Sequence, residues 1–257
     1  ALDGIYVDSL GLWGDFVNFR REHFAAERIP LTYDGMSGRP VIDNRFSLLA
    51  FLRDLGDLLH SRGRILFANG LHPDRRFHFF AVDVLGVEGH GRLEQKRAMA
   101  GSKPFLLLIY NIHEEPETMA EWYNRCVHWG IYPSFGSMRL FDTQEKYAPI
   151  ALLNNRYVPV LRAITGAGWQ PVPRVRATGG AGVERWGPAG EGPVYLTVFA
   201  EEAVETVLTL EREGWGGRAV SGARDLLSGE TFRCTRRRLT VPLQAGKVRV
   251  LQLRAEE

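Results

Sequence analysis

Acidic side chains stand where two apolar runs of this chain are expected to form strands. Asp8 closes the run at residues 4–8, and Asp83 and Glu88 lie inside and at the end of the run at 79–88. In parallel α/β sheets and barrels, active sites lie at the C-terminal ends of the strands. A carboxylate in that position needs solvent, a partner or a chemical role. Each Asp alone could cap a helix or anchor a loop, but Asp8 and Asp83 together favour a site.

Paired carboxylates are the minimum apparatus for breaking a glycosidic bond. One carboxyl group protonates the leaving oxygen, while the other attacks the anomeric carbon or activates a water molecule. The distance between the two groups decides whether the configuration at that carbon is retained or inverted.

Polar and aromatic side chains also gather in the segments that follow the expected strands. Aromatic rings can stack on sugar rings, and Asn, Asp, Arg and His can bind hydroxyl groups. Each aromatic residue alone is more typical of packing against a helix, but their clustering after strands favours a sugar site. The candidate substrate-binding residues are Trp13, Tyr33, Asp34, Asn69, His72, Glu88, Asn111 and Tyr132.

Strands and helices must alternate to position these residues, and the sequence predicts that they do. Helices are indicated by the 3.6-residue spacing of Phe46, Leu49, Leu52, Leu55 and Leu59 before Gly63, by a run that starts at Pro116 and reaches His128, and by residues 145–165. The expected strands are 4–8, 64–70, one within 79–88, 105–111 and 131–135. Continuous apolar strands separated by helices indicate βα units around a buried parallel sheet.

The composition changes after about residue 177. His, Asn, Met and Ile are absent from Thr178 onward, although all four occur earlier. Short alternating runs at 194–200, 204–211, 231–233, 239–243 and 247–254 predict an all-β antiparallel sandwich. We therefore expect a catalytic α/β portion at residues 1–177 and a C-terminal β-sandwich at 178–257.

The number of strands constrains the α/β portion. An eight-stranded (β/α)8 barrel takes about 250 residues, and five strands cannot close one. The portion is therefore either an open α/β sheet or the C-terminal part of a barrel whose first strands lie elsewhere.

Composition excludes several other classes of protein. The 257 residues are 45% hydrophobic and carry a formal net charge of +2, so nucleic acid and anionic membranes are not expected partners. No apolar stretch approaches the roughly 20 residues of a membrane-spanning helix, which predicts a soluble protein, whether cytoplasmic or secreted. Cys126 and Cys234 are expected to be free buried thiols, with one disulfide as the alternative.

No motif indicates a cofactor or a bound metal. The chain has no phosphate-binding loop, and His113-Glu114-Glu115 lacks the second His of a zinc-protease helix. A metal-dependent hydrolase that uses His72, His78 and Asp83 is the weaker alternative.

Two motifs resemble a known group of enzymes. DGIYVDSLG at residues 3–11 resembles the fourth barrel strand of retaining TIM-barrel glycoside hydrolases in the broad α-galactosidase and α-amylase-like assemblage. DLLSGE at 225–230 and VPLQAGKVRVL at 241–251 resemble their C-terminal β-sandwich. The resemblance implies that residues 1–177 supply about strands 4 to 8 of the barrel.

The same resemblance implies roles for the carboxylates. Asp8 matches the nucleophile at the end of the fourth strand. The amylase-like pattern has a Glu acid on the fifth strand, where this chain reads Phe-Ala-Asn-Gly. The α-galactosidase-like pattern has an Asp acid on the sixth strand, which matches Asp83, with Glu88 in reserve.

The resemblance therefore implies a retaining hydrolase for an α-linked sugar that needs no cofactor. Its partners would be a carbohydrate substrate and the N-terminal barrel segment, carried on the same or another chain. The alternative is a non-catalytic carbohydrate-binding or structural fragment of a larger glycosidase-like protein.

Overall fold

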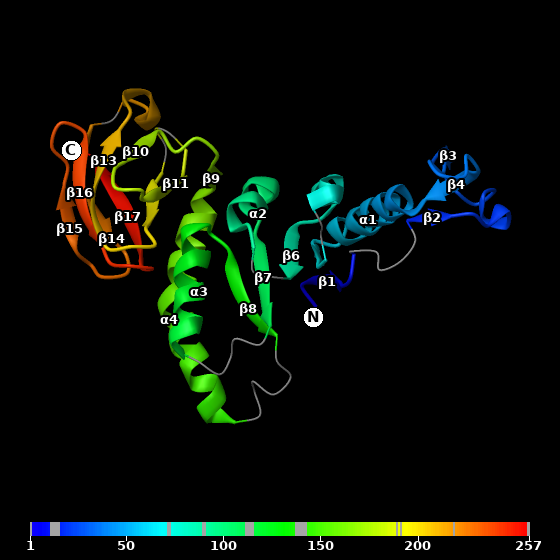
Figure 1. The fold of residues 1–257 in the computed structure, drawn as a ribbon, viewed down its shortest axis with the longest axis horizontal. Coiled ribbons are helices and arrows are strands. Elements are labelled where there is room, and N and C mark those ends of the chain that lie inside the picture. The colour runs from blue at the N-terminus through cyan, green and yellow to red at the C-terminus, as the bar shows by residue number, and fades with distance from the viewer. Residues whose placement is uncertain are drawn as a thin grey trace. The chain divides into compact units, whose positions relative to one another are not determined.

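The structure is a computed structural model, and it divides into two units, Ala1–Glu88 and Gly89–Glu257 (Figure 1). The residues that it describes are 2–10, 16–70, 73–88, 91–110, 116–136, 143–188, 190, 192–217 and 219–255.

Three parallel strands form the centre of the first unit, in the order β1-β5-β6. Gly4 pairs with Ile65, and Ala68 pairs with Leu85. The three C-terminal strand ends therefore lie at one edge of the sheet. The strands are β1 (Gly4–Val7), β5 (Ile65–Ala68) and β6 (Val84–Glu88), all within runs that the sequence predicts.

The predicted first helix is present as α1 (Asn44–His60), between β4 and β5. The carboxylate of Asp43 caps it by accepting a hydrogen bond from the backbone N–H of Arg45. Leu52 and Leu59 are buried, whereas Phe46 is 44% exposed and stacks on the ring of Phe77. The helix therefore buries a narrower face than its apolar spacing indicates.

A small antiparallel sheet, β2-β4-β3, lies before this helix in the chain. The sequence does not predict it, because its strands are only two to four residues long and sit in a Gly- and Pro-rich segment. The remaining elements of the first unit are β2 (Val17–Asn18), η1 (Arg21–His23), β3 (Thr32–Tyr33), β4 (Pro40–Asp43) and η2 (Pro73–Ala81).

The second unit begins with further α/β structure. Strands β7 and β8 are parallel, with Leu106 paired to Tyr132. Both strands and both long helices are predicted by the sequence, whereas α2 is not. The elements are α2 (Leu93–Ala100), β7 (Phe105–Tyr110), α3 (Pro116–His128), β8 (Tyr132–Gly136) and α4 (Gln144–Ala167).

Two antiparallel sheets follow, which confirms antiparallel β structure in the C-terminal part. Their strand orders are β15-β14-β17-β12-β11-β9 and β10-β13-β16. Leu196, Leu208, Val241 and Leu251 are fully buried among the side chains between them. The elements are β9 (Trp169–Gln170), β10 (Val175–Ala177), β11 (Gly182–Trp186), β12 (Tyr195–Phe199), β13 (Val204–Leu210), η3 (Arg212–Trp215), β14 (Val220–Asp225), β15 (Thr231–Arg233), β16 (Arg238–Leu243) and β17 (Val248–Ala255).

The larger sheet also packs against helices α3 and α4. Tyr195 and Phe199 of β12 and Val250 of β17 share one buried cluster with Tyr123 of α3 and Leu161 of α4. This second core explains why every residue of β12 is buried. The α/β elements of the second unit and its β-sheets therefore form one packed body.

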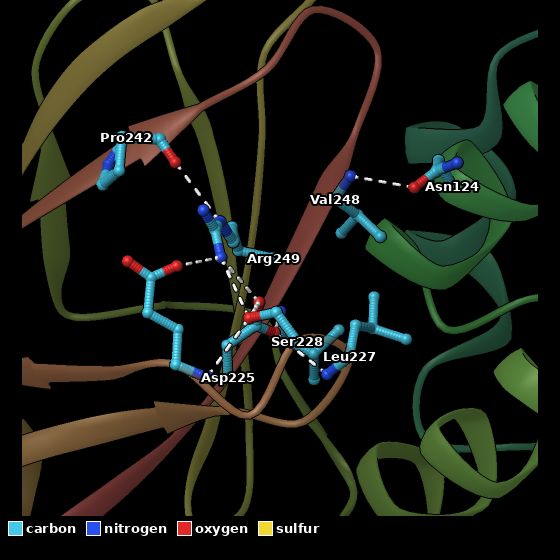
Figure 2. A network of polar contacts seen from close by, with 9 residues as sticks. Asn124, Asp225, Leu227, Ser228, Pro242, Val248 and Arg249 are labelled. Atoms are coloured by element: carbon cyan, nitrogen blue, oxygen red, sulfur yellow. Dashed lines mark hydrogen bonds and ion pairs between the residues drawn. The ribbon is translucent and has the colours of Figure 1, made fainter.

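A buried aspartate holds the turn of the DLLSGE motif (Figure 2). Asp225 is 1% exposed and accepts hydrogen bonds from the backbone N–H groups of Leu227 and Val250, each at 3.1 Å. It also accepts one from Ser228 and pairs with Arg249 at 3.0 Å. Asn124 of α3 accepts a hydrogen bond from the backbone N–H of Val248 at 3.0 Å. The motif therefore has a structural role that joins β14 to β17.

Neither Cys126, which is buried, nor Cys234, which is partly buried, forms a disulfide. Burial raises the pKa of the Cys126 thiol to about 12. Within the described residues, no helix is both long enough and apolar enough to cross a membrane.

Candidate active site at the ends of β1, β5 and β6

Asp8 directly follows β1 and is held by three hydrogen-bond donors. Its Oδ1 accepts from Asn69 Nδ2 and from the hydroxyl of Tyr6, each at 2.9 Å, and its Oδ2 accepts from Ser9 Oγ at 3.0 Å. Donors to a carboxylate favour its charged form. The pKa of Asp8 is accordingly lowered to about 2, with Asn69 as the largest cause. Asp8 is therefore ionised across the whole neutral range.

Asn69 directly follows β5 and bridges two carboxylates. Its Nδ2 donates to Asp8 and also to Glu88 Oε1, both at 2.9 Å. The side chain is buried, at 3% exposure. Its backbone N–H donates to Val7 O, and its carbonyl accepts from Leu10 N–H. These contacts fix the amide between the ends of β1 and β6.

Glu88 ends β6 and completes the cluster with an exposed carboxylate. The bonded oxygens of Asp8 and Glu88 each lie 2.9 Å from the same nitrogen, so they are at most twice that distance apart. Retaining glycosidases place their two carboxyl groups about 5–5.5 Å apart, and inverting enzymes about 6.5–9.5 Å apart. The two bonded oxygens are therefore closer together than the carboxyl groups of inverting enzymes.

Gly86 leaves the space that Asn69 and Phe67 need. A Cβ at this position would lie 2.8 Å from the Phe67 ring and 3.2 Å from Asn69 Oδ1. The Phe67 ring lies 4.8 Å from the ring of Tyr6. Burial, and then the neighbouring charge of Asp8, raise the pKa of Tyr6 to about 12, so this hydroxyl remains a donor. The sequence analysis missed Gly86, although a glycine inside a strand can mark such a close approach.

Asp83 lies at the other end of β6. It precedes the strand, and its Oδ2 accepts a hydrogen bond from Leu66 N–H at 2.7 Å and contacts His60 Nε2 at 2.8 Å. The five residue steps from Asp83 to Glu88 span roughly 16 Å of extended chain. The structure therefore does not bring Asp83 to Asp8, and its contacts join the end of α1 to β5.

Two candidate sugar-binding residues of the first unit lie on the β3 turn. Tyr33 is 72% exposed. Asp34 accepts hydrogen bonds from the backbone N–H and the hydroxyl of Ser37, at 2.7 and 2.6 Å. These bonds give Asp34 a turn-forming role. Trp13, His72 and Asn111 lie outside the described residues.

Tyr132 and His78 each have a structural partner. Tyr132 begins β8, in the second unit, and its hydroxyl bonds to Thr165 Oγ1 at 2.9 Å. His78 is buried, and its Nε2 lies 2.7 Å from the carbonyl oxygen of Arg45. Among the residues that the structure describes, no group of three or more His, Cys, Asp or Glu side chains could hold a metal ion.

Comparisons with known proteins give matches in structure alone. No protein-family model matches the chain, and no curated protein matches it in sequence. The α-amylase of Geobacillus thermoleovorans, solved in complex with acarbose, matches with a TM-score of 0.51 and 10% identity over 81% of this chain. A maltogenic α-amylase of Thermotoga neapolitana matches with a TM-score of 0.48 and 11% identity over 79% of this chain.

A second type of glycosidase also matches. The β-L-arabinopyranosidase of Geobacillus stearothermophilus, solved with arabinose, covers 99% of this chain and 89% of its own, with 12% identity and a TM-score of 0.39. The match to each of the two α-amylases covers 58% of the α-amylase chain. The likeness to the α-amylase of Geobacillus thermoleovorans, with its TM-score of 0.51, confirms at the level of the fold the resemblance to TIM-barrel glycoside hydrolases that the sequence indicates.

Proposed function

We propose that this chain carries the catalytic carboxylates of a retaining glycoside hydrolase for an α-linked sugar. Asp8 is the nucleophile and Glu88 is the general acid and base. The observation that carries the proposal is the amide of Asn69, which bonds to both carboxylates and keeps their bonded oxygens closer than the inverting range. Glu88, the reserve candidate, replaces Asp83 because Asp83 lies at the opposite end of β6.

The ionised state of Asp8 supports its role as the nucleophile. Asp8, whose pKa is about 2, is ionised and can attack the anomeric carbon to form a covalent glycosyl-enzyme. Glu88 is exposed and can give a proton to the leaving oxygen. It then takes a proton from the water that hydrolyses the intermediate. The Asn69 amide can stay bonded to both groups through each step.

The architecture supports a divided barrel. The first unit holds three parallel strands and the second unit two, which are the five that the sequence predicts. We propose that they are about strands 4 to 8 of a (β/α)8 barrel, with residues 178–257 as the C-terminal β domain. The remaining strands would come from the same or another chain. The α-amylase of Geobacillus thermoleovorans, crystallised with acarbose, supports an α-linked carbohydrate as the substrate.

The test uses activated aryl α-glycosides together with azide. Asp8→Ala should lose hydrolysis, and azide should restore turnover with formation of the β-glycosyl azide, because azide then attacks from the vacated face. Glu88→Gln should keep glycosylation of the enzyme, since an activated leaving group needs no acid, and azide should give the α-glycosyl azide. Proton NMR of the product distinguishes the two anomers.

Asp83→Asn is the matched control, because it changes the other carboxylate of the same segment. It should keep the hydrolysis rate within a few-fold of the parent chain. Full activity of Glu88→Gln on an unactivated glycoside, with loss in Asp83→Asn, would overturn the assignment. Sugar binding without turnover in the parent chain would favour the alternative, a non-catalytic carbohydrate-binding fragment.

A further inference from the structure

Arg185 of β11 is a buried cation without an anionic partner. The residue is 4% exposed, and its Nε has no hydrogen-bond partner. Its guanidinium lies over the ring of Trp215, at 4.7 Å from the centroid. No residue that the structure describes forms an ion pair with it within 4.0 Å. Buried charges are normally paired, so this site calls for a negative charge.

A second arginine faces the same space. Arg174 and Arg185 both line a cavity of about 280 Å³, together with Gln170, Glu213 and Gly214. Arg174 adopts a left-handed backbone conformation, with φ at 56°, which is uncommon for a residue other than glycine. Burial lowers the pKa of Arg185, and the nearby charge of Arg174 lowers it further. The two guanidinium groups therefore repel one another across the cavity.

Gly214 makes the approach of the two arginines possible. A Cβ on this residue would lie 2.6 Å from Arg174 Cβ and 3.5 Å from Arg185 Nη1. The indole Nε1 of Trp215, whose ring contacts the Arg185 guanidinium, is likewise buried without a hydrogen-bond partner.

We propose that this cavity binds a small oxyanion, a phosphate or a carboxylate group, between the guanidinium groups of Arg185 and Arg174. A guanidinium presents a planar fork of N–H donors that matches the oxygens of either group. The bound anion neutralises Arg185 and removes its repulsion from Arg174. All of its residues lie in the second unit, whereas Asp8 and Glu88 lie in the first.

The chain offers a matched pair of variants. Arg174 and Arg176 both form ion pairs with Glu211, at 3.8 and 3.3 Å, but only Arg174 lines the cavity. Arg174→Gln and Arg176→Gln therefore each remove one exposed ion pair and one positive charge. A difference in phosphate affinity between the two variants therefore reports the contribution of the cavity. Arg185→Lys keeps the charge but loses the fork, and circular dichroism checks its fold.

The experiment titrates the whole 257-residue chain with inorganic phosphate at constant ionic strength, by calorimetry. One saturable site is expected, weakened about tenfold or more by Arg174→Gln and by Arg185→Lys and unchanged by Arg176→Gln. Glu213→Gln removes a carboxylate from the cavity wall and should tighten phosphate binding. A titration with glucuronate tests whether the cavity also accepts a carboxylate. Glucose, which has no carboxylate, is the neutral control and should not bind.

Two results would overturn the proposal. One is that calorimetry detects no saturable binding of phosphate or glucuronate at constant ionic strength. The other is that Arg174→Gln binds phosphate as tightly as Arg176→Gln, which would place the anion outside the cavity.

Discussion

One amide group links the two proposed catalytic carboxylates. Asn69 Nδ2 donates to both Asp8 and Glu88, and its backbone bonds to Val7 at the end of β1 and to Leu10 beyond it. This hydrogen bond is also the largest cause of the lowered pKa of Asp8. Asn69 therefore positions Asp8 and Glu88 and also keeps Asp8 ionised.

Asn69→Ala should shift the acidic limb of activity to higher pH. The pKa of Asp8 is lowered to about 2 chiefly by Asn69, so removal of the amide raises it toward its ordinary value. The fraction of ionised nucleophile then begins to fall at a higher pH as acid is added. We expect the lower limb of kcat/KM against pH to move up by about one unit. Asp83→Asn should leave that limb unchanged, whereas an unshifted limb in Asn69→Ala would show that another group controls it.

The sequence locates this site through the rule on strand ends. Asp8, Asn69 and Glu88 each fall at the end of an apolar run, and parallel pairing brings those ends together. The run at 79–88 contains two carboxylates, and its apolar pattern does not reveal that the first residues form a 3-10 helix. The choice between Asp83 and Glu88 as the second carboxylate therefore depends on the residue at which β6 begins. Tertiary contacts determine that residue, and the local sequence pattern does not reveal it.

At the level of elements, the sequence predicts the helices and strands that contain long apolar segments. It does not predict those that are short or interrupted by polar residues. Helices α1, α3 and α4 have continuous apolar faces. Helix α2 instead buries Arg97, whose guanidinium donates to the carbonyl oxygens of Trp129 and Gly130 at 2.8 and 2.7 Å. A buried arginine interrupts the apolar period, so α2 carries no recognisable signal. Strand β9 is missed because it has only two residues, and β10, β11 and β14 are missed because Gly, Arg or Glu interrupts their apolar pattern.

The end of α3 carries a histidine that should make stability depend on pH. His128 is 3% exposed, its Nδ1 has no hydrogen-bond partner, and its ring contacts Trp129 and Phe199. Burial lowers its pKa to about 3, against an ordinary value of 6.5. Between these two values the unfolded chain binds a proton that the folded chain does not. Its contribution to stability is therefore complete above pH 6.5 and is lost as the pH falls toward 3.

His128→Gln should flatten this dependence. Urea unfolding at intervals from pH 7.5 to 4.5 gives the free energy of unfolding for the parent chain and the variant. The difference between their slopes should reach about 1.4 kcal/mol per pH unit, the value for one proton. His23→Gln is the control, because His23 is exposed and should leave the slope unchanged. Equal slopes for His128→Gln and the parent chain would mean that this ring is protonated in the folded state.

At the scale of the whole molecule, the second unit has two cores that share a sheet. One core lies between the two sheets, and the other lies between the larger sheet and helices α3 and α4. The composition change after residue 177 predicts a domain boundary inside this unit. Burial of β12 on both faces indicates that residues on either side of that boundary stabilise one another.

Two fragments should show whether residues 178–257 fold as an independent domain or need the rest of the second unit. Residues 89–257 contain both cores, so we expect one cooperative unfolding transition in guanidinium chloride. Residues 178–257 alone would expose Trp186, Tyr195, Phe199 and Val250, which α3 and α4 bury in the intact chain. At about 1.5–3 kcal/mol for each large apolar side chain, this exposure approaches the whole stability of a small domain. We therefore expect the shorter fragment to bind a hydrophobic dye and to aggregate. A shorter fragment that unfolds cooperatively, with the same midpoint as residues 89–257, would instead establish the boundary at residue 177 as that of an independent domain.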